Sequence, residues 1–288
     1  NLYVGNEVGI SIGGNEQTPY KFKNISIKNN VLTELGLTTI RALAWYMTVE
    51  DWDGGEVTDN LMIHNSNPSV TNVLGIMMVG GMRDVDVLRN TIYDIKGHLI
   101  DLQIRGTQEN MLLKDNVLQD PNNGQNLINF QDQTDLPQFT WQDNAYYSNV
   151  NQPFYILGEG NLDHSSWESF SQDNSVFQEI SFPDPTRSIE TYQSSIGGNP
   201  TIEAFLETAK SMGRYNWNPE YTATVVNDWF KAGFKDESII QCTIDSDCDD
   251  NIFCNGEETC NSGTCLTGSL PCTDDGIACT TECDESTD

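Results

Sequence analysis

The chain has 288 residues, of which 37% are hydrophobic, so it can bury a sizeable core and is long enough for two or three structural units. Asp and Glu number 43 against 14 Lys and Arg, which gives a formal net charge of −29. This excess of acid argues against nucleic acid and an anionic membrane as partners, and no run is long and apolar enough to predict membrane insertion.

The stretch of residues 1–160 repeats one pattern six times. Each copy is an Asn followed by two apolar residues, with a second apolar run further on; an alternating strand precedes five of the copies. The copies begin at Asn1, Asn30, Asn60, Asn90, Asn116 and Asn144, at spacings of 29, 30, 30, 26 and 28 residues. No helical period occurs in these units, so the sequence predicts an all-β solenoid in which neighbouring coils stack about 4.8 Å apart.

This arrangement resembles the right-handed parallel β-helix of the pectate-lyase-like superfamily. The repeated Asn fits, because Asn tolerates the left-handed backbone of a tight corner and its side chain can pair with its counterpart one coil away. The alternative is that Asn only marks the turns of a β-sandwich. Since the repeat is already under way at Asn1, we expect further coils and an N-terminal cap upstream.

Alternation in the second apolar run predicts which side chains enter the core. The residues expected to point inward are Ile10, Ile12, Leu43, Trp45, Ile76, Met78, Ile100, Leu102, Ile128 and Phe130. Those expected to point outward, in rows roughly 5 Å apart, are Ser11, Tyr46, Met77, Asp101, Gln103, Arg105, Asn129 and Gln131. Such rows can grip a linear polymer, although any solenoid needs polar residues on its outer face.

The candidate ligand-binding residues are Tyr46, Trp52, Gln103 and Asn129. Trp52 lies in the acidic loop of residues 50–55, where it could stack on a sugar ring or cover the edge of the core. Proteins with this fold include secreted polysaccharide lyases, glycoside hydrolases, epimerases and phage tailspikes, so the resemblance implies an extracellular polysaccharide as partner.

Catalysis is left open by the sequence. A lyase needs a base and a cation facing the uronate carboxylate, and His98, Asp101 and Arg105 are the candidates, with Arg41, Arg83 and Arg89 one or two coils away. A hydrolase needs carboxylates about 5 to 10 Å apart. Asp51, Asp53 and Asp101 are available for that role.

Residues 161–240 lose the repeat and begin as an irregular, aromatic-rich stretch. Two helices are then predicted. Thr201 caps the first, which Gly213 ends; Asn218 caps the second, which Gly233 ends. We expect these helices to close the open end of the solenoid, because an uncovered coil would expose strand edges and core.

All eight cysteines lie in residues 241–288: Cys242, Cys248, Cys254, Cys260, Cys265, Cys272, Cys279 and Cys283. This acidic segment is too small to fold without cross-links, so it is expected to be disulfide-bonded and the protein to be secreted or on a cell surface. Residues 272–284 resemble the Cys-Thr-Asp-Cys repeats of secreted slime-mould and bacterial proteins, with Glu282 in place of Asp.

Four carboxylates of this tail sit at close, partly alternating positions, as in oxygen-rich calcium loops: Asp245, Asp247, Asp249 and Asp250. They predict Ca²⁺ as a cofactor; a solvated acidic linker is the alternative.

The sequence therefore predicts a right-handed parallel β-helix over 1–160, a helical capping region over 161–240 and a disulfide-rich module over 241–288. Two functions remain open. The solenoid binds or processes an extracellular polysaccharide on its outward strand face. Alternatively, it is a non-catalytic structural or adhesive component of a cell surface or extracellular fibre, with another copy of itself as partner.

Overall fold

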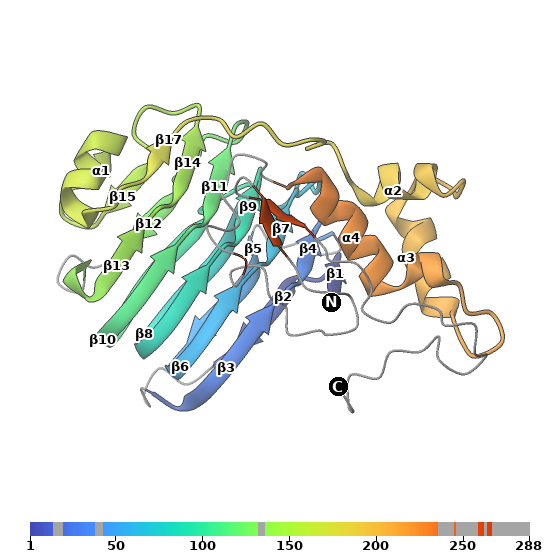
Figure 1. The fold of residues 1–288 in the computed structure, drawn as a ribbon, viewed down its shortest axis with the longest axis horizontal. Coiled ribbons are helices and arrows are strands. Elements are labelled where there is room, and N and C mark those ends of the chain that lie inside the picture. The colour runs from blue at the N-terminus through green and yellow to red at the C-terminus, as the bar shows by residue number, and fades with distance from the viewer. Residues whose placement is uncertain are drawn as a thin grey trace. The chain divides into compact units, whose positions relative to one another are not determined.

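The computed structural model describes residues 1–13, 20–37, 43–131 and 136–235, and in the tail Asp245 and residues 259–261 and 264–266. The chain forms two compact units, Asn1–Lys235 and Asp236–Asp288. The first is a parallel β-solenoid with four α-helices among its described residues, which confirms the predicted fold class (Figure 1). In the second, β18 (Thr259–Asn261) pairs antiparallel with β19 (Thr264–Leu266).

The first sheet contains the short strand that follows each repeated Asn, and one further strand after the last of them. Its described strands pair in chain order, all parallel. They are β1 (Leu2–Val4), β4 (Val31–Thr33), β7 (Leu61–Ile63), β9 (Thr91–Tyr93), β11 (Val117–Asp120), β14 (Ala145–Ser148) and β17 (Val176–Phe177). Because neighbours in this sheet come from consecutive repeats, each repeat is one coil. β17 adds a coil beyond the six copies read from the sequence.

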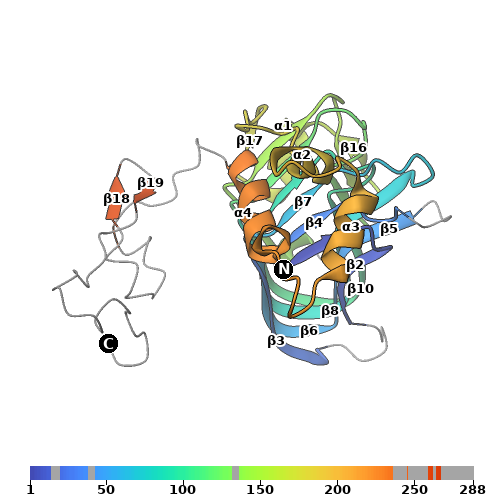
Figure 2. The same ribbon diagram turned by 90° about the vertical axis from the view of Figure 1, so that its right-hand side faces the viewer.

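The second sheet wraps around the rest of each coil (Figure 2). One side consists of β2 (Val8–Ile12), β5 (Leu43–Glu50), the first halves of β8 (Asn72–Leu88) and β10 (Ile100–Lys114), β12 (Ile128–Phe130), β15 (Phe154–Ile156) and β16 (Gly160–Leu162). The other side consists of β3 (Phe22–Lys28), β6 (Trp52–Thr58), the second halves of β8 and β10, and β13 (Phe139–Gln142).

A left-handed backbone position turns β8 from one side of the coil to the other. Gly80 has φ of 80°, and a Cβ atom there would lie 2.3 Å from Oδ1 of Asp51, one coil earlier. The same Oδ1 accepts a hydrogen bond from the N–H of Gly81 at 3.2 Å. Only glycine fits this corner.

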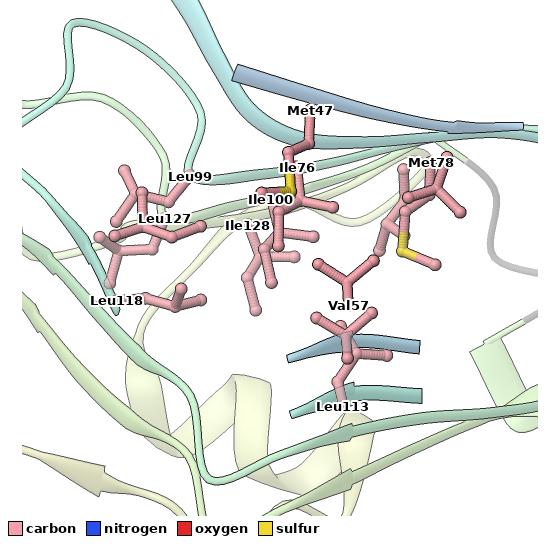
Figure 3. Packing of buried hydrophobic residues seen from close by; sticks show 14 of the residues in the cluster. Met47, Val57, Ile76, Met78, Leu99, Ile100, Leu113, Leu118, Leu127 and Ile128 are labelled. Carbon is pink, nitrogen blue, oxygen red and sulfur yellow. The ribbon is translucent and has the colours of Figure 1, made fainter. Parts of the chain in front are cut away.

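The interior is a continuous apolar column. Met47, Ile76, Ile100 and Ile128 occupy the same register in consecutive coils and lie in line through the core (Figure 3). All four are buried. The inward orientation predicted for Met78, Leu102 and Phe130 is likewise confirmed by their burial, while Ile10 and Ile12 pack against the core partly buried.

The inward assignment was wrong at β5. Tyr46, expected to point outward, is fully buried, and its hydroxyl donates to the carbonyls of Ile63 at 3.1 Å and His64 at 2.5 Å. Trp45, expected inward, is partly exposed. Two consecutive residues, Tyr46 and Met47, are both fully buried, so strict alternation fails within β5.

The repeated asparagines form a hydrogen-bonded ladder. From Asn1 to Asn116, Nδ2 of each one donates to Oδ1 of the next at 2.8 to 3.2 Å. From Asn30 onward, that Oδ1 also accepts the backbone N–H of the donor residue. The second Nδ2 proton of Asn60, Asn90, Asn116 and Asn144 reaches a carbonyl of an earlier coil at 2.8 to 2.9 Å. The predicted pairing of asparagines from coil to coil is confirmed.

The left-handed corner residue is the one before each ladder Asn. The five residues that precede Asn30, Asn60, Asn90, Asn116 and Asn144 all have φ between 50° and 58°: Asn29, Asp59, Arg89, Asp115 and Asp143. The ladder asparagines themselves are therefore selected by their side-chain hydrogen bonds, and the expectation that they supply the left-handed backbone is wrong by one position.

The helices depart from prediction in number and in place. They are α1 (His164–Ser171), α2 (Ile189–Ser195), α3 (Ile202–Ser211) and α4 (Ala223–Gly233), with 3-10 turns η1 (Leu136–Gln138) and η2 (Pro219–Tyr221). Thr201 caps α3 as predicted. Asn218 caps η2 instead of α4, which starts after Thr222. The stretch containing α1 was expected to be irregular.

The last coil is closed by α1 and not by the two predicted helices. Trp167 of α1 is fully buried against Trp141 and Phe154, at ring-centroid distances of 4.9 and 5.1 Å. The chain then runs back along the solenoid, so that α4 lies beside the first coils (Figure 1). There Asn227 Nδ2 donates to the carbonyl of Asn1 at 2.9 Å.

Candidate functional site

The candidate site is a row of polar side chains on the outer face of β10 and β12, which we call the amide row: Asp101, Gln103, Asn129 and Gln131. Asp101 and Asn129 are register partners in adjacent coils. The N–H of Gln131 donates to the carbonyl of Leu102 at 2.9 Å, which places Gln131 beside Gln103. Alternation with the core residues of β10 and β12 places Asp101, Gln103 and Asn129 on the side of their strands away from the core, as predicted from the sequence, and Gln131 follows β12 at the next such position.

A chain of hydrogen bonds fixes the amide row. Asn129 Nδ2 donates to Asp101 Oδ1 at 2.5 Å, and Gln103 Nε2 donates to Asp101 Oδ2 at 2.6 Å. Gln131 Nε2 donates to Asn129 Oδ1 at 3.1 Å. Each glutamine thus donates one N–H within the row. In the part of the chain that the structure describes, its carbonyl oxygen accepts no hydrogen bond and is available to a ligand.

The four residues of the amide row differ in burial, and their roles differ accordingly. Asp101 is 1% exposed and Asn129 is buried, whereas Gln103 is half-buried and Gln131 is exposed. Asp101 is therefore the anchor that orients the amides, and the glutamines are the groups that a ligand can reach. Among the described residues, the recorded partners of the Asp101 carboxylate are neutral amides.

His98 lies close enough to interact electrostatically with Asp101. Burial lowers the pKa of His98, and the Asp101 charge and a hydrogen bond to the backbone of Asn126 oppose that shift only in part. His98 is therefore predominantly neutral at neutral pH. Its Nδ1 is buried and has no hydrogen-bond partner in the described part of the chain. The side chain of Arg105, the third catalytic candidate, lies outside the described residues.

Two of the four predicted ligand-binding residues do not reach the surface. Tyr46 is buried, as described above, and Trp52 is also fully buried, with its Nε1 donating to the carbonyl of Ile12 at 3.0 Å. Trp52 thus covers the edge of the core, the second of the two roles considered for it. Gln103 and Asn129 do meet in one site.

Three of the other charged candidates, Asp53, Arg83 and Arg89, form ion pairs. Asp53 accepts hydrogen bonds from Lys23 and Arg83, which hold the pKa of its carboxyl well below the usual range. Arg89 binds both carboxylate oxygens of Asp59, at 2.8 and 3.0 Å. No recorded contact joins Asp51, Asp53 and Asp101, so the described residues do not show the paired carboxylates of a hydrolase. Arg41 lies outside the described part of the chain.

Comparison with protein-family models, with curated proteins and with solved structures finds no match to this chain.

The exposed aromatic rings were missed by the sequence analysis. Tyr215 is 97% exposed and Trp217 is 64% exposed, on the loop between α3 and η2. Asn216 fixes this loop, since its Oδ1 accepts from the N–H of Gly213 at 2.7 Å and its Nδ2 donates to the carbonyl of Ser211 at 2.9 Å. The sequence pattern that could have indicated these exposed rings is an Asn between two aromatic residues, shortly after a Gly that ends a helix.

In the tail, the carboxylate of Asp245 accepts a hydrogen bond from the N–H of Cys260 at 2.7 Å, and Cys260 is disulfide-bonded. The other three predicted calcium ligands, Asp247, Asp249 and Asp250, lie outside the described residues, as do the side chains of the remaining cysteines. Within the described part of the chain, no group of three or more acidic, His or Cys side chains gathers as a metal site. No described helix is long and apolar enough to cross a membrane.

Proposed function

We propose that this protein binds an uncharged, linear extracellular polysaccharide along the amide row. The observation that carries the proposal is the hydrogen-bonded chain from Gln103 through Asp101 and Asn129 to Gln131. It fixes two glutamine side chains on neighbouring coils, whose strands lie about 4.8 Å apart. Sugar hydroxyls can donate to their carbonyl oxygens, and a repeating polymer presents such hydroxyls at a regular interval.

The preference for a neutral polymer follows from charge. The net charge of −29 repels acidic polysaccharides, and the lowered pKa of His98 leaves the row without a cation from that residue. Tyr155 stands beside Asn129 in the next coil and is partly exposed, so it offers a ring face at the end of the row. The resemblance to the pectate-lyase-like superfamily and the cysteine-rich tail support an extracellular setting.

The test is affinity electrophoresis of the full chain through gels that contain neutral soluble polysaccharides, with uronate-containing polymers for comparison. We expect retention by a neutral polymer and a loss of roughly 3- to 10-fold in affinity for Gln103→Ala and for Gln131→Ala, since each removes one hydrogen-bond acceptor. Gln178→Ala, which removes an exposed glutamine away from the row, is the matched control.

Two outcomes would contradict the proposal. Retention by no polymer would favour the alternative of a structural or adhesive element. Retention lost in Trp217→Ala but kept in both glutamine variants would move the glycan site to the exposed loop between α3 and η2.

A further inference from the structure

Strand β13 is paired along one edge only in the part of the chain that the structure describes. Its partner is β10, in the preceding coil. The carbonyl of Gln142 accepts from the N–H of Asp115 at 3.1 Å, so the backbone groups of Gln142 face β10. Since backbone groups alternate between the two edges of a strand, those of Thr140 face β10 too, and those of Phe139 and Trp141 face away.

Asp143 is the next residue whose backbone groups should face away from β10, and its hydrogen bond confirms this direction. The N–H of Asp143 donates to Oδ1 of Asn174, which belongs to the following coil, at 3.1 Å. The last coil therefore covers the edge at Asp143 but supplies no strand for Phe139 and Trp141. Helix α1 stands where that strand would run, and a helix has no free backbone groups along its side to bond a strand edge.

A hollow of about 550 Å³ remains between this edge and α1. Its lining combines three surfaces: apolar side chains from η1 (Leu136 and Pro137), the strand edge of residues 139–141, and the end of α1 at Phe170, Ser171 and Gln172. Phe170 is 40% exposed although it is a large aromatic residue on a core-closing helix. The hollow thus joins unpaired backbone groups to an apolar wall with a polar end.

We infer that this hollow is a groove for an extended peptide that adds to β13 as a further strand. The main-chain groups of Phe139 and Trp141 offer alternating donors and acceptors, which another extended backbone matches and a sugar ring does not. The apolar wall, which includes Phe170, takes one apolar side chain of the peptide. The net charge of −29 favours a peptide with basic flanks. This site is separate from the amide row.

Amide hydrogen exchange on the full chain, followed by NMR, tests the groove before any ligand is known. In the free protein the N–H groups of Phe139 and Trp141, although these residues are buried, should exchange faster than those of Thr140 and Gln142, which bond to β10. Protection of Phe139 and Trp141 in the free protein would overturn the inference, because another part of the chain would then already pair with that edge.

Selection from a displayed library of random peptides supplies the probe. Selected peptides should protect the N–H groups of Phe139 and Trp141, and Phe170→Glu should weaken their binding about tenfold or more. Val225→Glu on α4 is the matched control, because Val225 is 41% exposed and distant in sequence. Peptide binding that Phe170→Glu leaves unchanged, or failure to select any peptide, would overturn the assignment.

The amide row serves as an internal control for this experiment. Gln103→Ala should leave peptide binding unchanged, so failure of the groove and failure of glycan binding are distinguished. Protection of Phe139 and Trp141 by a polysaccharide instead of a peptide would assign the hollow to sugar and overturn the inference.

Discussion

Asn90 satisfies buried polar groups of several coils at once. Its Oδ1 accepts from the N–H and Nδ2 of Asn60, and its Nδ2 donates to Asn116 Oδ1 and to the carbonyl of Val57. Asn90→Ala would leave these buried partners without hydrogen bonds, so we expect a loss of about 3 to 5 kcal/mol in the free energy of unfolding, measured by urea denaturation. Asn161→Ala, at an exposed position in β16, should cost little; equal losses would contradict a structural role for the ladder.

The ladder ends on a carboxylate. Asp173 Oδ2 accepts from Asn144 Nδ2 at 3.3 Å and from the hydroxyl of Tyr146 at 2.8 Å. Burial raises the pKa of Asp173 from 3.8 to about 6, so the native state binds this proton more tightly than the unfolded state does. Stability is therefore expected to fall as pH rises from about 4 to 6, with the full loss present above that window.

Asp173→Asn should continue the ladder without a charge. We expect the variant to be more stable than the wild type at pH 7.5, by about 1 to 3 kcal/mol, and the advantage to shrink at pH 4.5, where Asp173 is protonated. Urea denaturation at the two pH values measures both quantities. An advantage of the same size at both would show that ionisation of Asp173 is not its cause.

At the scale of elements, α1 replaces a strand at the last coil and closes the core through one side chain. Trp167→Ala should lower the free energy of unfolding by about 3 to 5 kcal/mol, because it opens a large cavity between Trp141 and Phe154. Trp217→Ala removes the same side chain from an exposed loop and should change stability little. Chemical denaturation of both variants checks this, and similar losses would mean that α1 does not close the core.

The sequence predicted the elements wherever the repeat was strong. Alternation placed Gln103 and Asn129 on the outer face correctly, because both lie in straight strand. It failed at Tyr46, because Tyr46 and its neighbour Met47 are both buried, and it missed α1, whose eight residues carry too short an apolar stripe to be recognised. The exposure of Trp52 could not be decided, since the carbonyl of Ile12 that its indole reaches lies forty residues away.

At the scale of the whole molecule, the two units carry separate chemical reporters. All six tryptophans lie within residues 1–235 and all eight cysteines within 236–288. We expect no free thiols by mass spectrometry before reduction. Reduction should leave the melting temperature reported by tryptophan fluorescence unchanged, because no disulfide constrains the first unit. A large fall on reduction would show that the units stabilise each other.

The calcium prediction belongs to the same tail. If Asp245, Asp247, Asp249 and Asp250 include calcium ligands, excess chelator should lower the melting temperature of the tail, followed by its disulfide circular dichroism, and leave tryptophan fluorescence unaffected. If chelator leaves the melting temperature of the tail unchanged, the prediction that the tail binds Ca²⁺ is wrong.

The asparagine ladder also makes the length of the solenoid adjustable. Its side-chain to side-chain hydrogen bonds all run in one sense, from Nδ2 of one coil to Oδ1 of the next, so consecutive coils meet through the same kind of junction. Duplication of a whole coil, such as residues 60–89, preserves every junction, whereas insertion of part of a coil breaks one. Gene duplication can therefore extend the molecule in whole steps of about 4.8 Å, and with it the length of polymer that its outer face spans.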